Sequence, residues 1–397
     1  MTRTIIVPFI PGDGIGPEIM AVSKTAISAA VHSSSGGSVQ IEWRELAAGE
    51  IAQKTKGQSL PQETLAVINE HGIALKGPLT TPVGSGIRSL NVAIRQALDL
   101  YANVRPVRYF AGVPSPVREP QKMNMVIFRE NTEDVYKGIE WKRGSPEAEA
   151  VLALIRSLGA TVREDSGVGI KPMSENASKR LVRAAMKYAI KHRLPSVTLV
   201  HKGNIMKFTE GAFRDWGYEL ARTEFADSSV PESTLQGGTV ANGRVVIKDR
   251  IADNMFQQIL TRPEEYSVLA TPNLNGDYLS DACAAQVGGL GLAPGANIGD
   301  STAVFEAVHG TSPKHAGRDV ANPCSLMLSG AMMLDHIGLE AASSALVKAI
   351  EATLADGIMT QDLARLGRDI KPVGTSRFAA EVIRRLDSGP IRRSADA

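Results

Sequence analysis

The sequence contains little cysteine and no long apolar run, and each shortage excludes a class of protein. Only Cys283 and Cys324 occur among 397 residues, so disulfides cannot form the framework of a chain this long. The apolar or small neighbours of both cysteines predict reduced thiols in a core. No stretch approaches the roughly 20 apolar residues needed to span a bilayer. The seven histidines are scattered and no C-x-x-C pair occurs, which excludes the common zinc spacings.

A strong net charge is also lacking. Lys plus Arg number 44 and Asp plus Glu 42, so the overall balance predicts no nucleic-acid partner and no membrane partner. The N-terminal apolar stretch is too short for a signal peptide, so we expect a cytoplasmic protein. From 88 to 129, however, seven cationic side chains stand against two carboxylates. This local excess suits a small polyanion, although a solvated basic face is an equal alternative.

Short apolar runs alternate with amphipathic stretches, which predicts an α/β architecture with a substantially parallel sheet. Strands are predicted at 4–10, 39–46, 73–77 and 196–201. Helices are predicted at 17–31, 61–71, 179–192, 245–260, 276–287, 325–336 and 340–356. Two regions interrupt the alternation. Residues 142–175 resemble an inserted arm with one helix at 147–158 and flanking strands, and 226–244 is predicted to be an exposed loop or hairpin.

The glycine-rich segment PGDGIGPE at 11–18 follows a predicted strand and precedes a predicted helix. A Rossmann phosphate loop requires G-x-G-x-x-G, whereas Gly12, Gly14 and Gly16 give G-x-G-x-G. Residues 288–300 fail the same test, and no P-loop occurs. A dinucleotide enzyme with this sequence would therefore not have the Rossmann fold.

The predicted helix that opens at Ser89 has one apolar face and one cationic face. Arg88, Asn91 and Arg95 fall within an arc of about 60° opposite the apolar residues. With free N–H groups at its start, such a helix can hold a carboxylate. An ordinary N-capped surface helix is the alternative, but Arg105 and Arg129 favour binding, since a polycarboxylate needs several forked donors.

Acidic residues also occur at helical spacing. Asp277 and Asp281 are four residues apart near a helix start, so they share a face and repel unless a cation or a donor lies between them. Asp253 could supply a third carboxylate, and oxygen ligands of this kind suit Mg²⁺ or Mn²⁺. The alternative, in which Asp277 caps the helix and Asp281 is solvated, is about equally good for the pair alone.

Seven segments together resemble one family. They are PGDGIGPE, TTPVGSGIRSLNVAIRQALDLYANVRPVRY, VIFRENTEDVYKGIEW, SVTLVHKGNIMKFTEGAF, NLNGDYLSDACAAQVGG, APGANIGD and HGTSPKHAG. From about residue 4 to about 386 they resemble the bacterial-type NADP-dependent isocitrate dehydrogenases, which belong with isopropylmalate dehydrogenase to the β-decarboxylating dehydrogenases. The resemblance implies a homodimeric enzyme of the tricarboxylic acid cycle and glyoxylate bypass. It would oxidise isocitrate to 2-oxoglutarate and CO₂ while reducing NADP⁺.

The resemblance also implies a role for each matching residue. The implied isocitrate-binding residues are Ser89, Asn91, Arg95, Arg105 and Arg129. The implied acid–base pair is Tyr136 and Lys202, and the implied ligands of Mg²⁺ or Mn²⁺ are Asp253, Asp277 and Asp281. Lys202 and Asp253 are expected to reach the site from the neighbouring subunit, so the two active sites of the dimer would be shared. Isopropylmalate enzymes carry apolar residues where Ser89 and Asn91 stand, and these two polar residues therefore favour isocitrate.

Cofactor choice follows from the same resemblance. The implied cofactor-binding residues are Thr80, Thr81, His309, Gly310, Thr311, Lys314, His315, Asn322 and Arg365. Lys314 matches the lysine that holds the 2′-phosphate of NADP, and Arg365 matches a second phosphate contact. His315 and Gln361 stand where two tyrosines are expected. An NAD enzyme would carry an acidic residue at 314, so the sequence favours NADP with weakened discrimination.

The implied fold is that of the isocitrate/isopropylmalate dehydrogenases and not a Rossmann fold. A large α/β domain would comprise 1–100 and 288–397, a smaller α/β domain 101–133 and 175–287, and a clasp between subunits 134–174. The runner-up activities are those of related enzymes for isopropylmalate, homoisocitrate or tartrate. A non-catalytic regulatory relative is a further alternative. Some bacterial relatives are switched off by phosphorylation of the serine that matches Ser89, so a regulatory kinase and phosphatase form a further hypothesis.

Overall fold

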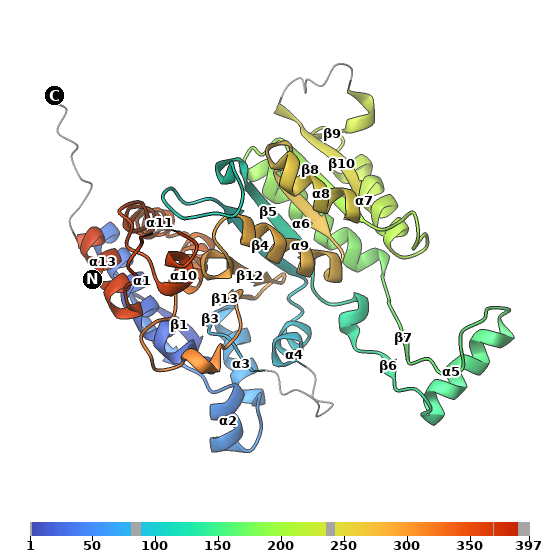
Figure 1. The fold of residues 1–397 in the computed structure, drawn as a ribbon, viewed down its shortest axis with the longest axis horizontal. Coiled ribbons are helices and arrows are strands. Elements are labelled where there is room, and N and C mark those ends of the chain that lie inside the picture. Colours follow the sequence, from blue (N-terminus) through green and yellow to red (C-terminus); the bar gives the residue numbers. More distant parts are fainter. Residues whose placement is uncertain (1, 81–88, 236–242, 368, 388–397) are drawn as a thin grey trace.

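One eleven-stranded sheet runs through the chain in the computed structural model, which describes residues 2–80, 89–235, 243–367 and 369–387 (Figure 1). In sheet order, the strands are β2 (Val39–Glu45), β1 (Arg3–Ile10), β3 (Ile73–Lys76), β13 (Ala303–Ala307), β12 (Pro294–Ile298), β4 (Ala102–Arg108), β5 (Asn124–Glu130), β11 (Val268–Thr271), β8 (Ser196–His201), β10 (Val245–Ile251) and β9 (Ser229–Pro231). The mixed α/β fold predicted from the sequence is confirmed.

Both flanks of the sheet are parallel, as predicted, but its centre is not. Strand β12 runs antiparallel to β13 and to β4, and β4 runs antiparallel to β5. The β12–β4 pairing, with Ile298 opposite Ala102, joins the two predicted domains through backbone hydrogen bonds. The division into two domains stays a prediction, whereas the sheet itself is continuous across the predicted boundary.

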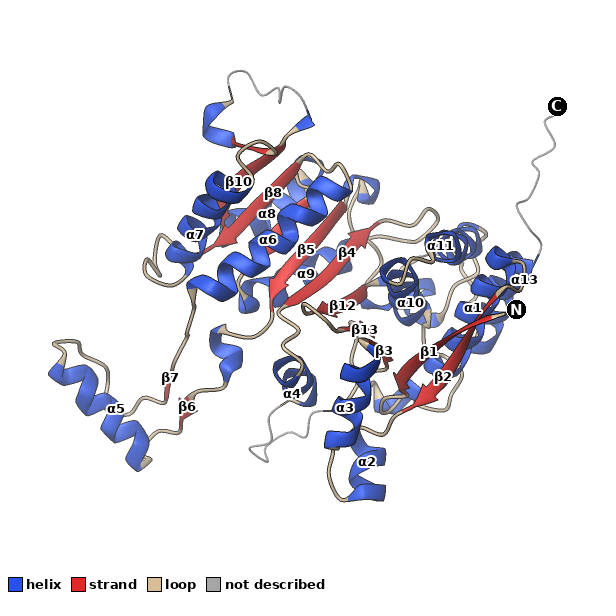
Figure 2. Ribbon diagram, turned by 180° about the vertical axis from the view of Figure 1, so that it is seen from behind, coloured by secondary structure: helices blue, strands red, loops and turns tan. Residues whose placement is uncertain are grey.

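Helices cover both faces of this sheet (Figure 2). They are α1 (Gly16–Ser35), α2 (Gly49–Lys56), α3 (Gln62–His71), α4 (Leu90–Ala97), α5 (Pro146–Ser157), α6 (Glu175–Lys191), α7 (Glu210–Glu224), α8 (Ala252–Thr261), α9 (Asn273–Gln286), α10 (Cys324–His336), α11 (Glu340–Ala355), α12 (Gln361–Ala364) and α13 (Thr375–Asp387). Helices α1, α10, α11 and α13 pack with α6 and α7 into the main core. On the opposite face, α3 and α4 cover one end, and α8 and α9 the other.

Successive side chains along a strand point to opposite faces of the sheet, and this alternation explains why the sheet has a layer of helices on each face. Phe9 and Leu75 face the main core, while their neighbours Ile10 and Ala74 face α3 and α4. Cys324 lies in the main core, and Cys283, on α9, lies in the core that α8 and α9 form with the sheet; both are buried free thiols, as predicted.

The helix predicted over 245–260 is wrong. Residues Val245–Ile251 form β10, which pairs in parallel with β8, and only Ala252–Thr261 form a helix. The β-branched run at the start of this segment, with Val245 and Ile247 buried, favours a strand, and pairing with β8 decides the outcome. This correction matters for the site, because it places Asp253 just beyond the carboxyl end of a parallel strand.

The arm predicted at 142–175 protrudes from the body of the molecule (Figures 1 and 2). It consists of the short antiparallel pair β6 (Glu140–Trp141) and β7 (Val168–Gly169), with α5 between them. Ser145 caps α5 by accepting a hydrogen bond from the N–H of Ala148. Among the helices of the described residues, none is long and apolar enough to cross a bilayer.

Candidate active site

Four parallel strands deliver polar side chains to one edge of the sheet. Strands β5, β11, β8 and β10 are neighbours in this order, so their carboxyl ends meet at the same edge. Arg129 lies near the end of β5, α9 follows β11, Lys202 follows β8, and Asp253 follows β10. Ligands of open α/β sheets bind at this edge.

At the start of α9, an arginine, a tyrosine and an aspartate contact one another. Arg129, 1% exposed, donates from Nε to Asn273 Oδ1 at 2.8 Å and forms an ion pair with Asp277. Tyr136 donates its hydroxyl to the other oxygen of Asp277 at 2.6 Å, and its ring lies 4.8 Å from the Arg129 guanidinium carbon. A Cβ at Gly276 would lie 2.7 Å from the side chain of Arg129, so only glycine permits this close approach.

Asp281 extends the cluster on the same face of α9. Arg105 Nη1 donates to Asp281 Oδ1 at 3.2 Å and lies 3.8 Å from Asp277 Oδ1. It also donates to Ser280 Oγ at 2.5 Å. The shared face that the spacing of Asp277 and Asp281 predicts is therefore present. The structure brings together Arg105, Arg129, Tyr136 and both aspartates, which lie far apart in the sequence.

The protonation of the cluster follows from these contacts. Burial raises the pKa of Tyr136 to about 12, with a further contribution from the hydrogen bond to Asp277, so its hydroxyl keeps its proton at neutral pH. Burial alone would raise the pKa of Asp277, but Arg129 and Tyr136 outweigh it and the pKa is lowered. The pKa of Arg129 is lowered to about 10, first by burial and then by the neighbouring guanidiniums of Arg105 and Arg95. Arg129 therefore lies among guanidiniums that repel its charge, with Asp277 as its counterion.

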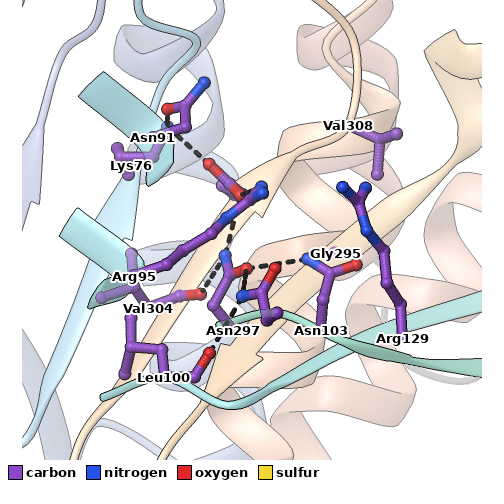
Figure 3. A network of polar contacts seen from close by, with 12 residues as sticks. Lys76, Asn91, Arg95, Leu100, Asn103, Arg129, Gly295, Asn297, Val304 and Val308 are labelled. Atoms are coloured by element: carbon purple, nitrogen blue, oxygen red, sulfur yellow. Dashed lines mark hydrogen bonds and ion pairs between the residues drawn. The ribbon is translucent and has the colours of Figure 1, made fainter. Parts of the chain in front are cut away.

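A second cluster lies beside the first, where α4 meets β3 and β13 (Figure 3). Glu306, 5% exposed, pairs with Lys76 at 2.5 Å and with Arg95 at 2.8 Å. Lys76 also donates to Asn91 Oδ1 at 2.9 Å. Asn91 and Arg95 therefore share one ion-pair network. Ser89 stands at the N-cap position of α4, as predicted, whereas Arg88 and Thr81 lie outside the described residues.

Sequence reasoning missed Lys76, Glu306 and three asparagines of this cluster. Asn297 donates to Glu306 Oε1 at 2.7 Å and accepts from Asn103 and Asn131 at 2.7 and 3.0 Å (Figure 3). A charged residue in the otherwise apolar strand β13 is the signal that could have indicated Glu306, because a buried carboxylate requires cationic partners.

Glu306 makes stability depend on pH. Burial by itself would raise its pKa, but Lys76 and Arg95 hold the pKa well below the usual range. Its contribution to stability is thus present above the unfolded pKa of about 4.3 and is lost as pH falls toward the lower folded pKa. We expect urea denaturation to show Glu306→Gln less stable than the unmodified protein at pH 6. This difference should narrow by about 1.4 kcal/mol per pH unit below pH 4. A difference independent of pH between 6 and 3 would contradict this assignment.

Lys202 and Asp253 form a separate pair. Lys202 Nζ donates to Asp253 Oδ1 at 2.5 Å, and the Asp253 side chain is 68% exposed. Within the described residues, no group of three His, Cys, Asp or Glu side chains is close enough to hold a metal ion. A single chain therefore does not assemble the predicted trio of aspartates, although it presents Asp277 and Asp281 together.

Two cavities adjoin these clusters. One of about 100 Å³ is lined by Lys76, Asn91, Arg95, Arg105 and Glu306, with His309 and Gly310 at its border. The other, of about 500 Å³, is lined by residues that include Gly288, Gly289 and Gly291. His309 and Gly310 line both cavities.

The larger cavity collects most of the predicted cofactor residues that the structure describes. Its lining includes His309, Gly310, His315, Asn322 and Arg365, together with Gln361. Burial lowers the pKa of His309, which favours the neutral imidazole. Thr80, Thr311 and Lys314 are not part of the lining.

The PGDGIGPE turn supports the loops around this cavity. Ile15 donates its N–H to Thr311 O at 2.9 Å, and a Cβ at Gly14, whose φ is +58°, would lie 2.1 Å from the same oxygen. Asp13, 3% exposed, accepts the N–H of Thr80 at 2.8 Å. The glycines thus permit close backbone packing beside the cavity, a role different from that of a Rossmann phosphate loop.

The fold and the site define an α/β enzyme with a cationic cleft beside a larger glycine-lined cavity. Residues 6–382 match the sequence family described as isocitrate/isopropylmalate dehydrogenase. The chain belongs to the isocitrate/isopropylmalate dehydrogenase family.

Similar proteins cover nearly the whole chain. It is 56% identical over 387 residues to "Isocitrate dehydrogenase [NADP]" of Archaeoglobus fulgidus, covering 96% of this chain and 93% of the relative. It is 54% identical over 394 residues to the protein of the same name from Coxiella burnetii, covering 96% and 91%. Among solved structures, isocitrate dehydrogenase from Methylococcus capsulatus matches with 38% identity and a TM-score of 0.79, covering 97% and 99%. The TT0538 protein of Thermus thermophilus matches with 34% identity and a TM-score of 0.80, covering 98% and 70%.

Proposed function

We propose that the protein oxidises and decarboxylates isocitrate with NADP⁺ and Mg²⁺ or Mn²⁺, in the cytoplasm and within the tricarboxylic acid cycle and glyoxylate bypass. The observation that carries the proposal is the wall of His309 and Gly310 shared by the two cavities. Hydride transfer requires substrate and nicotinamide to meet, and these two residues border both a cationic pocket and a cavity large enough for part of a dinucleotide, so the two cavities adjoin. The names of the relatives support both the substrate and the cofactor.

Three guanidiniums and one ammonium support a tricarboxylate as substrate. Arg95, Arg105 and Lys76 line the small cavity, and Arg129 lies beside Arg105. Asn91 faces the same cavity with a polar amide, where the isopropyl group of isopropylmalate would need an apolar wall. Ser89, at the start of α4, is proposed to hold the third carboxylate. The alternatives of isopropylmalate, homoisocitrate and tartrate are thereby less favoured.

The residues at the start of α9 fit a divalent cation. Asp277 and Asp281 present carboxylates 35% and 51% exposed on one helix face. Burial raises the pKa of Asp281, and the neighbouring Asp277 raises it further, although Arg105 opposes both effects. The ion would polarise the substrate oxygens, and Asp253 of a neighbouring subunit would supply a further ligand.

Tyr136 and Lys202 are proposed to move the protons. Tyr136 is protonated at neutral pH and therefore suits the acid that delivers a proton to carbon after CO₂ leaves. Asp253 holds the Lys202 side chain in place. The neutral amine of Lys202, formed when the ammonium loses a proton, is suited to accept the hydroxyl proton of the substrate as hydride leaves. Arg129 orients both the Tyr136 ring and Asp277.

A homodimer with shared active sites is supported by the surface of the chain. Most of the exposed large apolar residues that the structure describes lie in the turn before the arm, on the arm, on α8 and α9, and in the loop that follows Lys202. They are Val135, Leu154, Leu158, Val162, Ile170, Ile205, Phe208, Leu260 and Tyr278. Phe208 is 92% exposed although it lies only six residues beyond Lys202. A second copy of the chain that covered this surface would receive Lys202 and Asp253 near its own α9.

A spectrophotometric assay tests the proposal. Isocitrate and Mg²⁺ should give reduction of NADP⁺, and removal of the cation with EDTA should abolish it. Activity with isopropylmalate, homoisocitrate or tartrate but none with isocitrate would assign the protein to a related reaction. No activity with any of the four would favour the non-catalytic alternative.

The cofactor preference depends on Lys314. Replacement by aspartate puts a carboxylate where the 2′-phosphate of NADP⁺ is proposed to bind, so we expect KM for NADP⁺ to rise by about 100-fold (roughly 2.7 kcal/mol). KM for NAD⁺ should change less than threefold, because NAD⁺ has no phosphate there. Initial rates with both cofactors measure this effect. Equal changes for both cofactors would show that Lys314 does not select between them.

We also propose, from the family resemblance, that phosphorylation of Ser89 regulates the enzyme. A phosphate at this position would repel the substrate carboxylate. The variant Ser89→Asp should therefore bind isocitrate less tightly than Ser89→Thr, and equal affinities in the two variants would count against the hypothesis.

A further inference from the structure

A lysine outside the described clusters lies between two buried carboxylates. Lys171, two residues beyond β7 where the arm returns to the body, forms ion pairs with Asp134 and with Glu210, the latter at 3.0 Å. Both carboxylate side chains are 1% exposed, and the lysine side chain is 18% exposed. An ammonium removed this far from water costs free energy unless both partners are kept in place. The three residues come from three separate elements, so this junction fixes those elements relative to one another.

On one side, Asp134 holds the turn that carries Tyr136. The 3-10 turn Asp134–Lys137 begins with φ +67° at Asp134, a conformation that costs free energy for a non-glycine residue. The Asp134 carboxylate accepts the N–H of Val135 at 2.7 Å and the N–H of Leu274, in the first turn of α9, at 3.0 Å. Asp134 therefore joins the Tyr136 turn to the helix that carries Asp277.

On the other side, Glu210 holds the turn that carries Lys202. Its Oε2 accepts the backbone N–H of Lys202 at 2.5 Å and the amide of Asn275 at 2.8 Å. A Cβ at Gly203 would lie 2.6 Å from Gly211 Cα, so this turn packs directly against the start of α7. The position of the Lys202 backbone thus depends on the Glu210 carboxylate.

We propose that Lys171 is a positioning residue for Tyr136 and Lys202 of its own chain at once. This inference rests on the proposed function, in which Tyr136 acts in one active site of the dimer and Lys202 in the other. Lys171 therefore connects the two active sites through one chain. Glu210 positions Lys202, which acts in the site of the partner subunit, and Asp134 positions Tyr136, which acts in the site of its own chain. None of the three junction residues lines either cavity, so the junction is expected to act on the geometry of the catalytic groups and not on binding.

Hybrid dimers test this inference. One chain carries Tyr136→Phe and the other Lys202→Met, with two affinity tags so that only the mixed dimer is purified. One site then lacks both groups, and the other site combines Tyr136 of the Lys202→Met chain with Lys202 of the Tyr136→Phe chain. We expect this hybrid to have about half the turnover of the unmodified dimer, because one of its two active sites is intact and independent sites contribute additively. A hybrid without activity would overturn the shared active sites on which this inference rests, while the assay of the unmodified dimer tests the proposed function separately.

Lys171→Met is then placed in one chain of the hybrid at a time. Either placement should lower kcat at least about tenfold, because displacement of a catalytic group by 1 Å costs up to about 100-fold. KM for isocitrate should change less than about threefold, because the residues that bind the substrate in its ground state are not altered. In the Tyr136→Phe chain the variant displaces the working Lys202, and in the Lys202→Met chain it displaces the working Tyr136. Loss of kcat from only one placement, or from neither, would overturn the inference.

Two further variants separate positioning from folding. Lys171→Arg keeps a cation between the carboxylates and should restore most of kcat in both placements. Lys179 provides a matched control, because it also bridges two carboxylates, Glu175 and Glu219, and its side chain is 19% exposed. Lys179→Met removes this link between α6 and α7 and should leave kcat unchanged. An equal loss of kcat in Lys179→Met, or no rescue by Lys171→Arg, would show that Lys171 serves stability alone.

Discussion

Replacement of Lys202 by methionine is expected to lower kcat for isocitrate about 1,000-fold, within the range that a general acid or base contributes. Methionine has about the length of the lysine stem but cannot accept or donate a proton. Asp253, the partner of Lys202, is 68% exposed, so loss of the ion pair leaves a carboxylate in contact with solvent and is expected to leave the stability nearly unchanged. Steady-state kinetics and a thermal unfolding curve measure the two effects on the same preparation.

Lys202→Arg provides the control for charge. Arginine keeps the positive charge but does not deprotonate, so it should pair with Asp253 and still leave turnover low. If Lys202→Arg recovered most of the activity, Lys202 would act as a fixed charge and not as a proton carrier. Full turnover in Lys202→Met would remove Lys202 from the reaction altogether.

The second large effect is expected for Arg129. Its guanidinium is buried and contacts Asn273, Asp277 and the Tyr136 ring, so Arg129→Met removes a proposed substrate contact and the main cation beside Asp277. Loss of one partner of a buried charged pair costs roughly 2–5 kcal/mol. We therefore expect kcat/KM for isocitrate to fall by about 1,000-fold, which corresponds to about 4 kcal/mol.

Arg118 supplies a control within the same basic segment, because it is exposed to solvent. Arg118→Met should leave kcat/KM within twofold, since an exposed charge outside the cleft has little effect on binding a small anion. Comparable losses in Arg118→Met and Arg129→Met would indicate long-range attraction of the substrate in place of direct contact. A change of less than tenfold in Arg129→Met would contradict its proposed role in binding.

Local patterns predicted the elements of the fold better than their pairing. The spacing of Asp277 and Asp281 placed both on one face of α9, which the structure confirms, because helical periodicity is local information. The segment that begins at Val245 was misassigned, because only its pairing with β8 distinguishes a strand from a helix there. The reversal of direction at β12 has no sequence signal of its own, since strand direction depends on contacts between distant segments.

The candidate site was predictable where a motif carries it and not elsewhere. Arg105 and Arg129 were predicted as forked donors for a polycarboxylate and Tyr136 through the resemblance, and the structure places the three together. Glu306 and Lys76 were missed because 230 residues separate them, and the only local signal is the charge of Glu306 within an apolar strand. Lys171 was missed because it, Asp134 and Glu210 are far apart in the sequence and become neighbours only where the two ends of the arm meet the start of α7.

The antiparallel junction of β12 with β4 has a mechanical consequence. Backbone hydrogen bonds continue across the sheet at this point, so the two predicted domains are joined by paired strands and not by a flexible linker. We expect any closing of the cleft to twist the hydrogen-bonded sheet at β12 and β4. The sheet resists this twist in proportion to the angle and reopens the cleft when the product departs. The backbone amides of Ala102 to Val104 should therefore exchange hydrogen slowly both without and with bound substrate, because their hydrogen bonds to β12 persist when the sheet twists.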